Sequence, residues 1–388
     1  MSKWKEHCFS DAMEICPRVS LKGANSYSFV EMKDLSDGNR YCYPSTERKL
    51  SGGSRFQDGD TLFARITPCL ENGKICQAAG LKNSVGFGST EFLVFRGKKG
   101  ITDNDFVFYL SRSDEVRSFA EQNFDGTSGR QRVPKSAFDN LLILLPPLPE
   151  QRAIAGVLSS FDDKIDLLHR QNKTLAAMAE AIFRYFFIDN RKAARQECTV
   201  SKLAAHDKTS VHPNRNPDTI FYHYSIRAYD ETQIPIPELG SLIQSNKYKV
   251  TKSIILLSKL NPHKDKRIWL IPSSIGENSI CSTEFQIIKP KAEKYLFFLY
   301  GFISHSENYD EIAAGVGGTS GSHQRIDPEV IFKFKCFLPD ESILTNYNEM
   351  VEPIFAKIHH NRESMQTLIH QRDLLLPKMM SGEVRVRV

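Results

Sequence analysis

Two stretches of the chain carry apolar residues at alternating steps of four and three, which is the pattern of a helical seam. The first seam runs through Ile154, Leu158, Phe161, Ile165, Leu168, Asn172, Leu175, Ala179, Ile182 and Phe186, and the second through Tyr347, Val351, Ile354, Ile358, Asn361, Met365, Leu368, Arg372, Leu375 and Met379. A sustained seven-residue period is typical of a coiled coil, because the seam of a straight helix drifts by about 20° per heptad. The alternative interpretation is an ordinary helix that is buried on one face.

Each seam contains one amide, Asn172 in the first and Asn361 in the second. A buried amide costs stability but restricts register, so we expect the helices to run antiparallel with these two residues paired. This register leaves Arg372 opposite Phe161, and we expect Pro353 either to kink the second helix or to mark its start. The predicted seam contacts are Leu158, Phe161, Ile165, Leu168, Asn172, Leu175, Ile354, Ile358, Asn361, Met365, Leu368 and Leu375.

The segments before the two helices alternate short β-type runs with turns and helical stretches. In the first segment the β-type runs are 27–32, 61–66, 91–95 and 141–145, with a helix over 103–122. In the second they are 222–226, 253–257, 267–271 and 284–288, with a helix near 292–304. Clusters of Gly, Asp and Pro separate the runs, which indicates α+β domains.

An internal repeat relates the two segments. Ser-Thr-Glu-Phe at 89–92 returns at 282–285, an offset of 193, and Gly-Thr-Ser-Gly at 126–129 returns at 318–321. Matches that keep one order and nearly one offset indicate a duplicated plan. We therefore predict two tandem α+β domains, residues 1–149 and 191–339, each followed by a long helical segment, 150–190 and 340–388. The helices are predicted to form an antiparallel coiled coil, with pseudo-two-fold symmetry relating the two halves.

Composition is that of a globular protein, with 388 residues, 40% hydrophobic and 25% charged. No apolar run approaches the ~18 to 20 residues that cross a bilayer, and the first residues lack the pattern of a secretory signal. The 8 cysteines have no metal-binding or disulfide-framework spacing. We expect a cytoplasmic protein without a membrane segment.

The usual local signatures of catalysis are missing from the sequence. No phosphate-binding loop of the Gly-x-x-x-x-Gly-Lys-Ser/Thr type occurs, and the glycine-rich stretch 315–321 does not link a strand to a helix as a dinucleotide loop does. The 11 histidines show no metal-ligand spacing. We predict that this chain has no catalytic residue, no metal site and no cofactor of its own.

Positive charge is concentrated in the two repeated segments. The formal charge is +2 for residues 1–149 and +5 for 191–339, whereas each helical segment carries −1. The repeated turns combine Arg and Gln, which suit base edges, with hydroxyl groups and glycine amides, which suit phosphates. A solvated surface turn is the alternative. The predicted DNA-contacting residues are Arg65, Thr67, Lys74, Thr127, Ser128, Arg130, Gln131, Arg132, Lys259, Asn261, Lys264, Lys266, Arg267, Thr319, Ser320, His323, Gln324 and Arg325.

Three stretches of sequence resemble one known family. Residues 144–155, Leu-Leu-Pro-Pro-Leu-Pro-Glu-Gln-Arg-Ala-Ile-Ala, resemble the junction between a target recognition domain and a long helix in specificity subunits of type I restriction-modification systems. Residues 17–21, Pro-Arg-Val-Ser-Leu, are similar to an early signature of that family, with Cys16 in place of its usual Asn, and residues 372–386 are similar to its carboxyl end. The sequence departs from the family at 340–342, where Asp-Glu-Ser replaces Pro-Glu-Gln, so the start of the second helix stays open.

The resemblance implies two target recognition domains that each read one half of a bipartite, asymmetric site in double-stranded DNA. It also implies that the helices fix the spacing and dock two methyltransferase subunits, which use S-adenosylmethionine, while motor-nuclease subunits use ATP and Mg. The chain would direct these reactions without catalysing either. A rigid spacer sets the half-site separation geometrically, at about one helical turn or ~34 Å. The alternatives are a non-catalytic coiled-coil adaptor and a specificity half of another restriction class.

Overall fold

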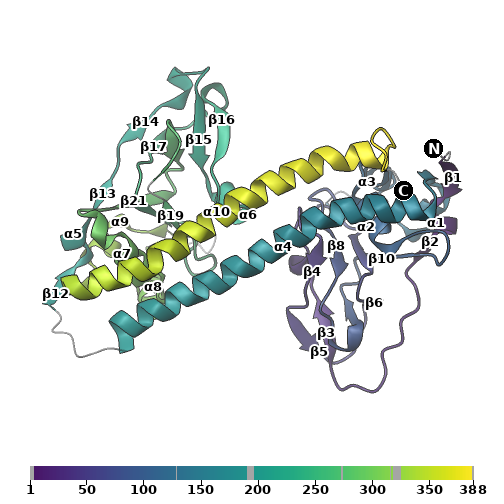
Figure 1. Cartoon of the computed structure of the whole chain (residues 1–388), viewed down its shortest axis with the longest axis horizontal. Coiled ribbons are helices and arrows are strands. Elements are labelled where there is room, and N and C mark those ends of the chain that lie inside the picture. The colour runs from purple at the N-terminus through teal and green to yellow at the C-terminus, as the bar shows by residue number, and fades with distance from the viewer. Residues whose placement is uncertain are drawn as a thin grey trace. The chain divides into compact units, whose positions relative to one another are not determined.

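The protein forms two compact units, Met1–Leu167 together with Thr367–Val388, and Leu168–Gln366 (Figure 1). The computed structural model describes residues 4–127, 129–189, 196–271, 274–314, 316–317 and 325–386. Each unit contains one α+β domain and a segment of each of two long helices, α4 (Leu148–Arg184) and α10 (Glu341–Met380). The predicted tandem α+β plan is confirmed.

The first unit contains two sheets, one strand pair and short helices, of which α2 packs on the first sheet. The elements are β1 (Lys5–Cys8), α1 (Phe9–Ala12), β2 (Met13–Ile15), β3 (Tyr27–Val30), β4 (Tyr41–Cys42), β5 (Thr46–Arg48), β6 (Ser54–Gln57), β7 (Thr61–Ala64), β8 (Ile75–Ala78), β9 (Val85–Gly88), β10 (Phe92–Gly97), α2 (Asn104–Arg112), α3 (Asp114–Gln122) and β11 (Leu142–Leu145). The strand orders are β2-β10-β7-β8-β4 in the first sheet and β5-β3-β9-β6 in the second, and β1 pairs with β11. Most pairs are antiparallel, while β3–β9 and β4–β8 are parallel.

Aromatic side chains fill the core of the first unit between the first sheet, α2 and the long helices. Phe63 and Phe95 from the sheet contact Phe138, with ring centroids 5.9 and 5.2 Å from it. Ile154 of α4 and Met379 of α10 are buried in the same cluster. The start of α4 and the end of α10 are therefore parts of the core of this unit.

Most elements of the first unit recur in the second in the same order, with additions, although β4 has no counterpart among the described residues. The elements of the second unit are β12 (Gln196–Thr199), α5 (Val200–Leu203), β13 (Ala204–Asp207), β14 (Ser210–Val211), β15 (Ile220–Tyr224), α6 (Ile226–Glu231), β16 (Ile236–Leu239), β17 (Lys247–Lys249), β18 (Ile254–Ser258), β19 (Ile268–Ile271), β20 (Ser279–Cys281), β21 (Phe285–Pro290), α7 (Leu296–Ser304), α8 (Ser306–Ala314), β22 (Val316–Gly317), β23 (Arg325–Ile326), α9 (Pro328–Lys333) and β24 (Lys335–Leu338). The strand orders are β13-β21-β18-β19 and β14-β17-β20-β15-β16, with separate pairs β12-β24 and β22-β23.

The internal repeat of the sequence is a repeat of topology. The sheet core β10-β7-β8 of the first unit corresponds to β21-β18-β19 of the second, and the first residues of these strands match at an offset of 193. The parallel pair β3–β9 corresponds to the parallel pair β15–β20. In the first unit β4 adds a further strand beside β8, whereas no described strand lies at the corresponding place beside β19.

Helix α4 begins at Leu148, directly before the Pro-Glu-Gln stretch, and its first turn is held by buried polar contacts. The side-chain amide of Gln151 donates to the carbonyl groups of Ile101 and Pro146, at 2.9 Å each, and its oxygen accepts from Asp103 N at 2.9 Å. Glu150 forms a two-pronged ion pair with Arg385, at 2.6 and 2.7 Å. These contacts tie the start of α4 to the loop before α2 and to the C-terminal segment.

Helix α10 begins at Glu341 and continues through Pro353. Asp340 Oδ1 accepts from the backbone N–H groups of Ser342 and Ile343 at 2.9 and 3.3 Å, so an aspartate cap replaces the Pro-Glu-Gln start of the first copy. The interpretation of Pro353 as the helix start is wrong, because this cap lies well before Pro353 in the chain.

The predicted helix over 103–122 is two helices. Ser113 adopts an extended conformation, with φ −62° and ψ 150°, and its hydroxyl caps α3 by accepting from Val116 N. Serine competes for backbone hydrogen bonds in this way more readily than apolar residues do. In the described part of the chain, no helix is both long and apolar enough to cross a membrane.

Candidate nucleic-acid interface

The repeated turn of the first unit is closed by its own backbone. Asp125 N donates to Arg132 O at 3.0 Å and Arg132 N donates to Asp125 O at 2.8 Å, so the two residues form an antiparallel bridge. Gly126 and Gly129 have φ values of +112° and +79°, a region that glycine enters at little cost. Of the predicted contacts, Ser128 lies outside the described residues.

The turn lies against the segment that follows β7. Thr67 N donates to Gln131 O at 3.0 Å, and Gln131 N donates to the hydroxyl of Thr67 at 3.1 Å. Val133 N donates to Arg65 O at 2.9 Å. The structure therefore brings together three predicted residues, Arg65, Thr67 and Gln131, although Thr67 is buried and uses its hydroxyl to hold the turn.

Arg132 forms a two-pronged ion pair with Glu91, the residue just before β10. Its Nε lies 2.9 Å from Glu91 Oε2 and its Nη2 lies 2.7 Å from Oε1. This contact raises the pKa of Arg132. Sequence reasoning did not assign Glu91 to the site, although the repeated Ser-Thr-Glu-Phe motif marked it.

The other predicted residues of the first unit divide into exposed and anchored groups. Thr127 and Arg130 are exposed, and Gln131 is half-buried. Lys74 is not part of this group, because its ammonium donates to the carbonyl of Met32 at 2.9 Å. Side chains without an internal partner are the ones available to a ligand, so Arg130 and Gln131 are the best placed of the predicted readers.

The second unit builds the same frame. Lys259 N donates to Glu284 O at 2.9 Å, and Ile326 N donates to Lys259 O at 3.0 Å. Arg325 Nε and Nη2 lie 3.0 and 2.8 Å from the carboxylate oxygens of Glu284. The structure thus repeats the arginine–glutamate pair of the first unit. The predicted residues Thr319, Ser320, His323 and Gln324 lie outside the described residues.

The run 259–267 does not form one basic surface. Arg267 is paired with Asp230 at 2.6 Å and with Asp265 at 3.1 Å, so two carboxylates compensate its charge. Lys266 donates to Ser304 O. Asn261 has φ +47° and its carbonyl accepts from the backbone of Lys264 and Asp265. Of the predicted cations here, Lys264 is exposed, and burial lowers the pKa of Lys259.

The two long helices run antiparallel within each unit. In the second unit Asn361 Nδ2 donates to Asn172 Oδ1 at 2.9 Å, which is the amide pair that the seams predict. In the first unit Arg372 contacts Asp162. Of the predicted seam residues, Leu158, Ile165, Leu168, Ile358, Asn361 and Met365 are buried, and Phe161, Asn172, Leu175, Ile354, Leu368 and Leu375 are half-buried.

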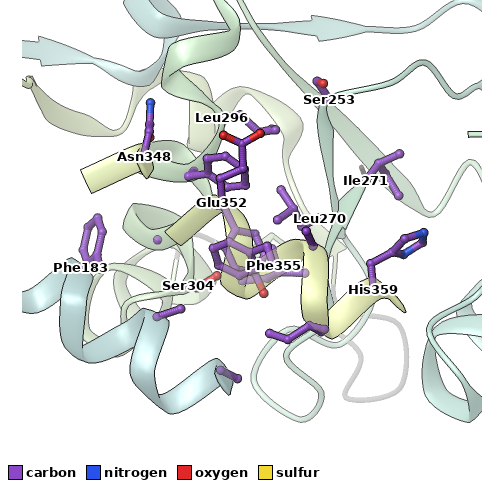
Figure 2. Close-up of a pocket in the computed structure, with 18 of the residues that line it drawn as sticks. Phe183, Ser253, Leu270, Ile271, Leu296, Ser304, Asn348, Glu352, Phe355 and His359 are labelled. Atoms are coloured by element: carbon purple, nitrogen blue, oxygen red, sulfur yellow. The ribbon is translucent and has the colours of Figure 1, made fainter. Parts of the chain in front are cut away.

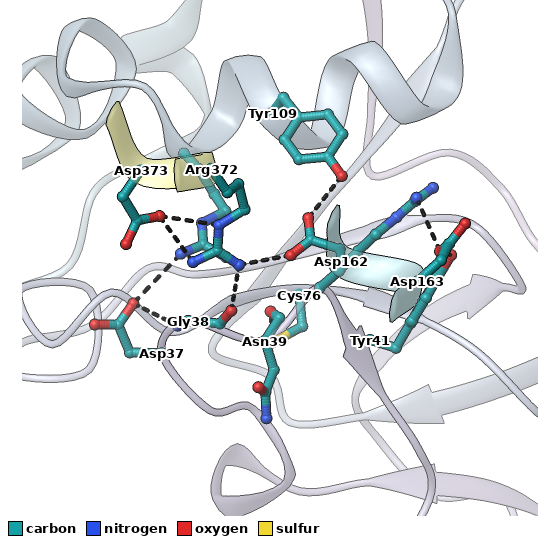
Figure 3. Close-up of polar contacts among 12 residues, drawn as sticks. Asp37, Gly38, Asn39, Tyr41, Cys76, Tyr109, Asp162, Asp163, Arg372 and Asp373 are labelled. Carbon is teal, nitrogen blue, oxygen red and sulfur yellow. Dashed lines mark hydrogen bonds and ion pairs between the residues drawn. The ribbon is translucent and has the colours of Figure 1, made fainter. Parts of the chain in front are cut away.

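Arg372 is the centre of a buried polar network in the first unit (Figure 3). Its Nη1 lies 2.5 Å from Asp162 Oδ1 and 2.6 Å from the carbonyl of Gly38, and Tyr109 OH donates to Asp162 Oδ2 at 2.6 Å. Its neighbour Asp373 accepts from Nε at 2.9 Å. The charge that Arg372 places in the apolar seam is therefore compensated by Asp162 of α4, by Asp373 of α10 and by the carbonyl of Gly38 in the first domain.

The second unit has a cavity where the first has this network. The cavity has a volume of about 1040 Å³, and Figure 2 shows residues of α4, α7 and α10 around it, among them Phe183, Phe355 and Ser304. Ala179 takes the place of Arg372 at the repeat offset, and Gly301 of α7 takes the place of Tyr109 of α2; both line the cavity. Gly301 lies directly against the ring of Phe183, which leaves no room for a side chain at this position.

Among the described residues, no group of three or more His, Cys, Asp or Glu side chains is arranged to hold a metal ion.

The chain thus combines two related α+β domains, each with an arginine–glutamate pair beside its sheet, and two long helices. Residues 2–177 match the family model of the type I restriction modification DNA specificity domain. This stretch is slightly less than half of the chain, and the chain is similar in sequence to type I specificity subunits.

Curated relatives are similar to the chain in sequence, and one solved structure is similar to it in fold. The chain is 32% identical over 176 residues to the type I restriction enzyme EcoEI specificity subunit of Escherichia coli, covering 44% of this chain but only 30% of that subunit. It is 24% identical over 315 residues to the MjaIX specificity subunit of Methanocaldococcus jannaschii, covering 74% of this chain and 71% of that subunit. The fold is similar to the crystal structure of the type I restriction-modification S subunit from M. genitalium, with a TM-score of 0.56, 12% identity, and coverage of 97% and 96% of the two chains.

Proposed function

We propose that the chain is the DNA sequence-specificity subunit of a type I restriction-modification complex. Each α+β domain reads one half of a bipartite, asymmetric site in double-stranded DNA. The long helices set the distance between the half-sites and dock two methyltransferase subunits. The chain directs methylation and restriction and catalyses neither.

The observation that carries this proposal is the repeated arginine–glutamate pair. In both units an arginine is paired with the glutamate directly before β10 or β21. The residue after each arginine donates its backbone N–H to the residue that follows β7 or β18. Two domains with one frame and different turn residues suit two readers of different sequences. Two long helices that pair antiparallel within each unit suit a spacer.

The chemistry belongs to the partners in this proposal. Methyltransferase subunits supply S-adenosylmethionine, and motor-nuclease subunits use ATP and Mg. The charge of the chain fits this division of labour, since the two domains are basic and the helical segments, which are nearly neutral, suit protein contacts.

Co-expression with the methyltransferase encoded beside the chain tests the proposal. Methylated bases are then mapped across the genome of the host, with the methyltransferase alone as control. We expect a two-part motif with methylated adenines, and none when the chain is omitted. Replacement of residues 1–149 by the first domain of another specificity subunit should change one half of the motif and leave the other half and the gap unchanged. The absence of any motif, or a motif that survives the replacement, would contradict the proposal.

A further inference from the structure

The two arginine–glutamate pairs, which we call clasps, join the two motifs that recur in the sequence. The first clasp is Arg132–Glu91 and the second is Arg325–Glu284. In each, the glutamate belongs to the repeated Ser-Thr-Glu-Phe and the arginine ends the repeated turn. The sequence repeat at an offset of 193 therefore reflects one contact that occurs in both units.

The first clasp holds the turn by its backbone as well as by its charge. Arg132 Nη1 donates to Arg130 O at 3.1 Å, while its Nε and Nη2 hold Glu91. Glu91 is itself fixed, because its N–H donates to Ser89 Oγ at 3.1 Å and its carbonyl accepts from Arg65 N at 2.9 Å. The same two contacts fix Glu284, through Ser282 and Lys259.

These contacts leave Arg132 poorly suited to read a base directly. A guanine is recognised by two parallel donors of one guanidinium edge. In Arg132 the Nε–Nη2 edge is occupied by Glu91, and Nη1 is partly used by the turn. Among the residues that the structure describes, the guanidinium of Arg130 has no ion pair, and the side-chain amide of Gln131 has no hydrogen-bond partner.

We propose that Glu91 and Glu284 are positioning residues for DNA recognition, which rests on the function proposed above. Each carboxylate holds the arginine of its own turn, and so sets the register in which the neighbouring turn side chains meet the bases. Arg132 and Arg325 belong to this positioning device and are not base readers. Each clasp serves only the half-site of its own domain.

The side chains of the first clasp are partly exposed to solvent, which distinguishes a positioning role from a contribution to folding stability. The side chain of Glu91 is 22% exposed and that of Arg132 is 41% exposed, and such pairs contribute little to stability. Breaking one should lower the melting temperature by less than about 4 °C. The effect should appear instead in the choice of DNA sequence.

The test uses Glu91→Gln and Arg132→Lys in the complex with methyltransferase subunits. We expect both variants to reduce the preference for the recognised sequence in one half-site by about tenfold, and to leave the other half-site unchanged. Arg132→Lys keeps the charge, so a phosphate contact would survive it. If Arg132 read a base itself, Glu91→Gln would leave the preference intact.

The salt dependence of binding gives an independent readout. Glu91→Gln releases the guanidinium of Arg132, which can then meet a phosphate. We expect non-specific binding to be as tight or tighter, and the slope of log K against log salt to steepen by up to about 0.9. If Glu91→Gln instead removed a phosphate interaction of the turn, that slope would become shallower.

The matched control is Glu47→Gln, which removes the same charge from the first unit and breaks a somewhat more exposed ion pair with Lys82. We expect it to leave both half-sites unchanged. Glu284→Gln provides the same test in the second domain and should affect the other half-site. A preference within about twofold of the unmodified chain for Glu91→Gln, or a complex that no longer assembles, would overturn the proposal. Failure of the proposed function is a separate result, since the unmodified chain would then yield no motif at all.

Discussion

At the scale of single residues, the structure compensates a charge that the seam pattern places at an apolar position. The side chain of Arg372 is 2% exposed and that of Asp162 is 1% exposed. A buried ion pair of this kind adds little net stability, yet removing one partner is costly because the other stays charged and desolvated. The network with Tyr109 and Gly38 supplies the hydrogen bonds that make burial tolerable.

Asp162→Asn should therefore destabilise the protein strongly. We expect a decrease of about 3 kcal/mol in the free energy of unfolding of the first unit, at the lower end for a broken buried pair because Asp373 and the carbonyl of Gly38 still hold Arg372. Chemical denaturation checks this. Asp373→Asn is the control: this residue faces solvent, with 52% of its side chain exposed, and should cost at most about 1 kcal/mol. Equal decreases in the two variants would show that burial of Asp162 is not the cause.

His206 should make stability depend on pH. Burial lowers the pKa of this histidine from 6.5 to about 4, with Lys208 and Lys259 adding to the effect, and its ring stacks on Phe332. Between these two values the unfolded chain binds more protons than the folded one, so stability is retained above pH 6.5 and lost as the pH falls toward 4. We expect the fall in melting temperature from pH 7 to pH 5 to be smaller for His206→Gln than for the unmodified chain. The exposed His263→Gln serves as control, and an unchanged pH profile of His206→Gln would rule out this residue as the source.

At the scale of elements, the long helices are the part of the fold that local pattern predicts best. The seam of each helix is a spacing of apolar residues within one segment of the chain. This spacing can be seen in the sequence without knowing which other segment packs against the helix. The ends of the helices are less predictable. Asp340 caps α10 from outside the seam, and Ser113 breaks a stretch that is helical on both sides.

The amide pair between the helices should show strong coupling. Asn361 is fully buried, and Asn172 supplies its hydrogen-bond acceptor. Asn172→Leu leaves the amide of Asn361 unpartnered, at a cost of about 1 to 3 kcal/mol, whereas the double replacement by Leu removes both polar groups and should be nearly neutral. We expect a coupling energy of at least about 1 kcal/mol from unfolding of the two single variants and the double variant. Additive effects would mean that the two amides do not act as a pair.

At the scale of the whole molecule, duplication makes recognition modular. Each domain has its own core and its own clasp, so the arginine of each clasp is held by a glutamate of its own domain. This organisation allows the two half-sites of the proposed DNA target to be altered one at a time.

Replacing the glutamine of each turn should therefore relax one half-site only. We expect Gln131→Ala to broaden the bases accepted in one half of the methylated motif and Gln324→Ala to broaden the other half, because removing a base-reading side chain typically costs about 1 to 3 kcal/mol of discrimination. Mapping of methylated bases with each variant, and with both together, measures this. A uniform decrease of methylation at all sites would assign both residues to the phosphate backbone instead.

Much of this protein could be predicted from its sequence, because the signals involved are local or repeated. The seams, the Asn172–Asn361 pair and the duplicated α+β plan depend on spacing along the chain, which a single sequence displays. The basic turns were visible for the same reason, as residues that recur at one offset.

Only the tertiary structure decided which charges face one another. Arg132 and Glu91 are 41 positions apart, and Arg372 and Asp162 are 210 apart, so no local pattern pairs them. The structure pairs each clasp glutamate with the arginine of the repeated motif. It also shows that Arg267 and Lys74 are not free cations, because Asp230 of α6 holds Arg267 and the carbonyl of Met32 holds Lys74. Spacing along a chain determines which elements form, whereas the partners of a charged side chain depend on which distant segments the fold brings within about 3 Å of it.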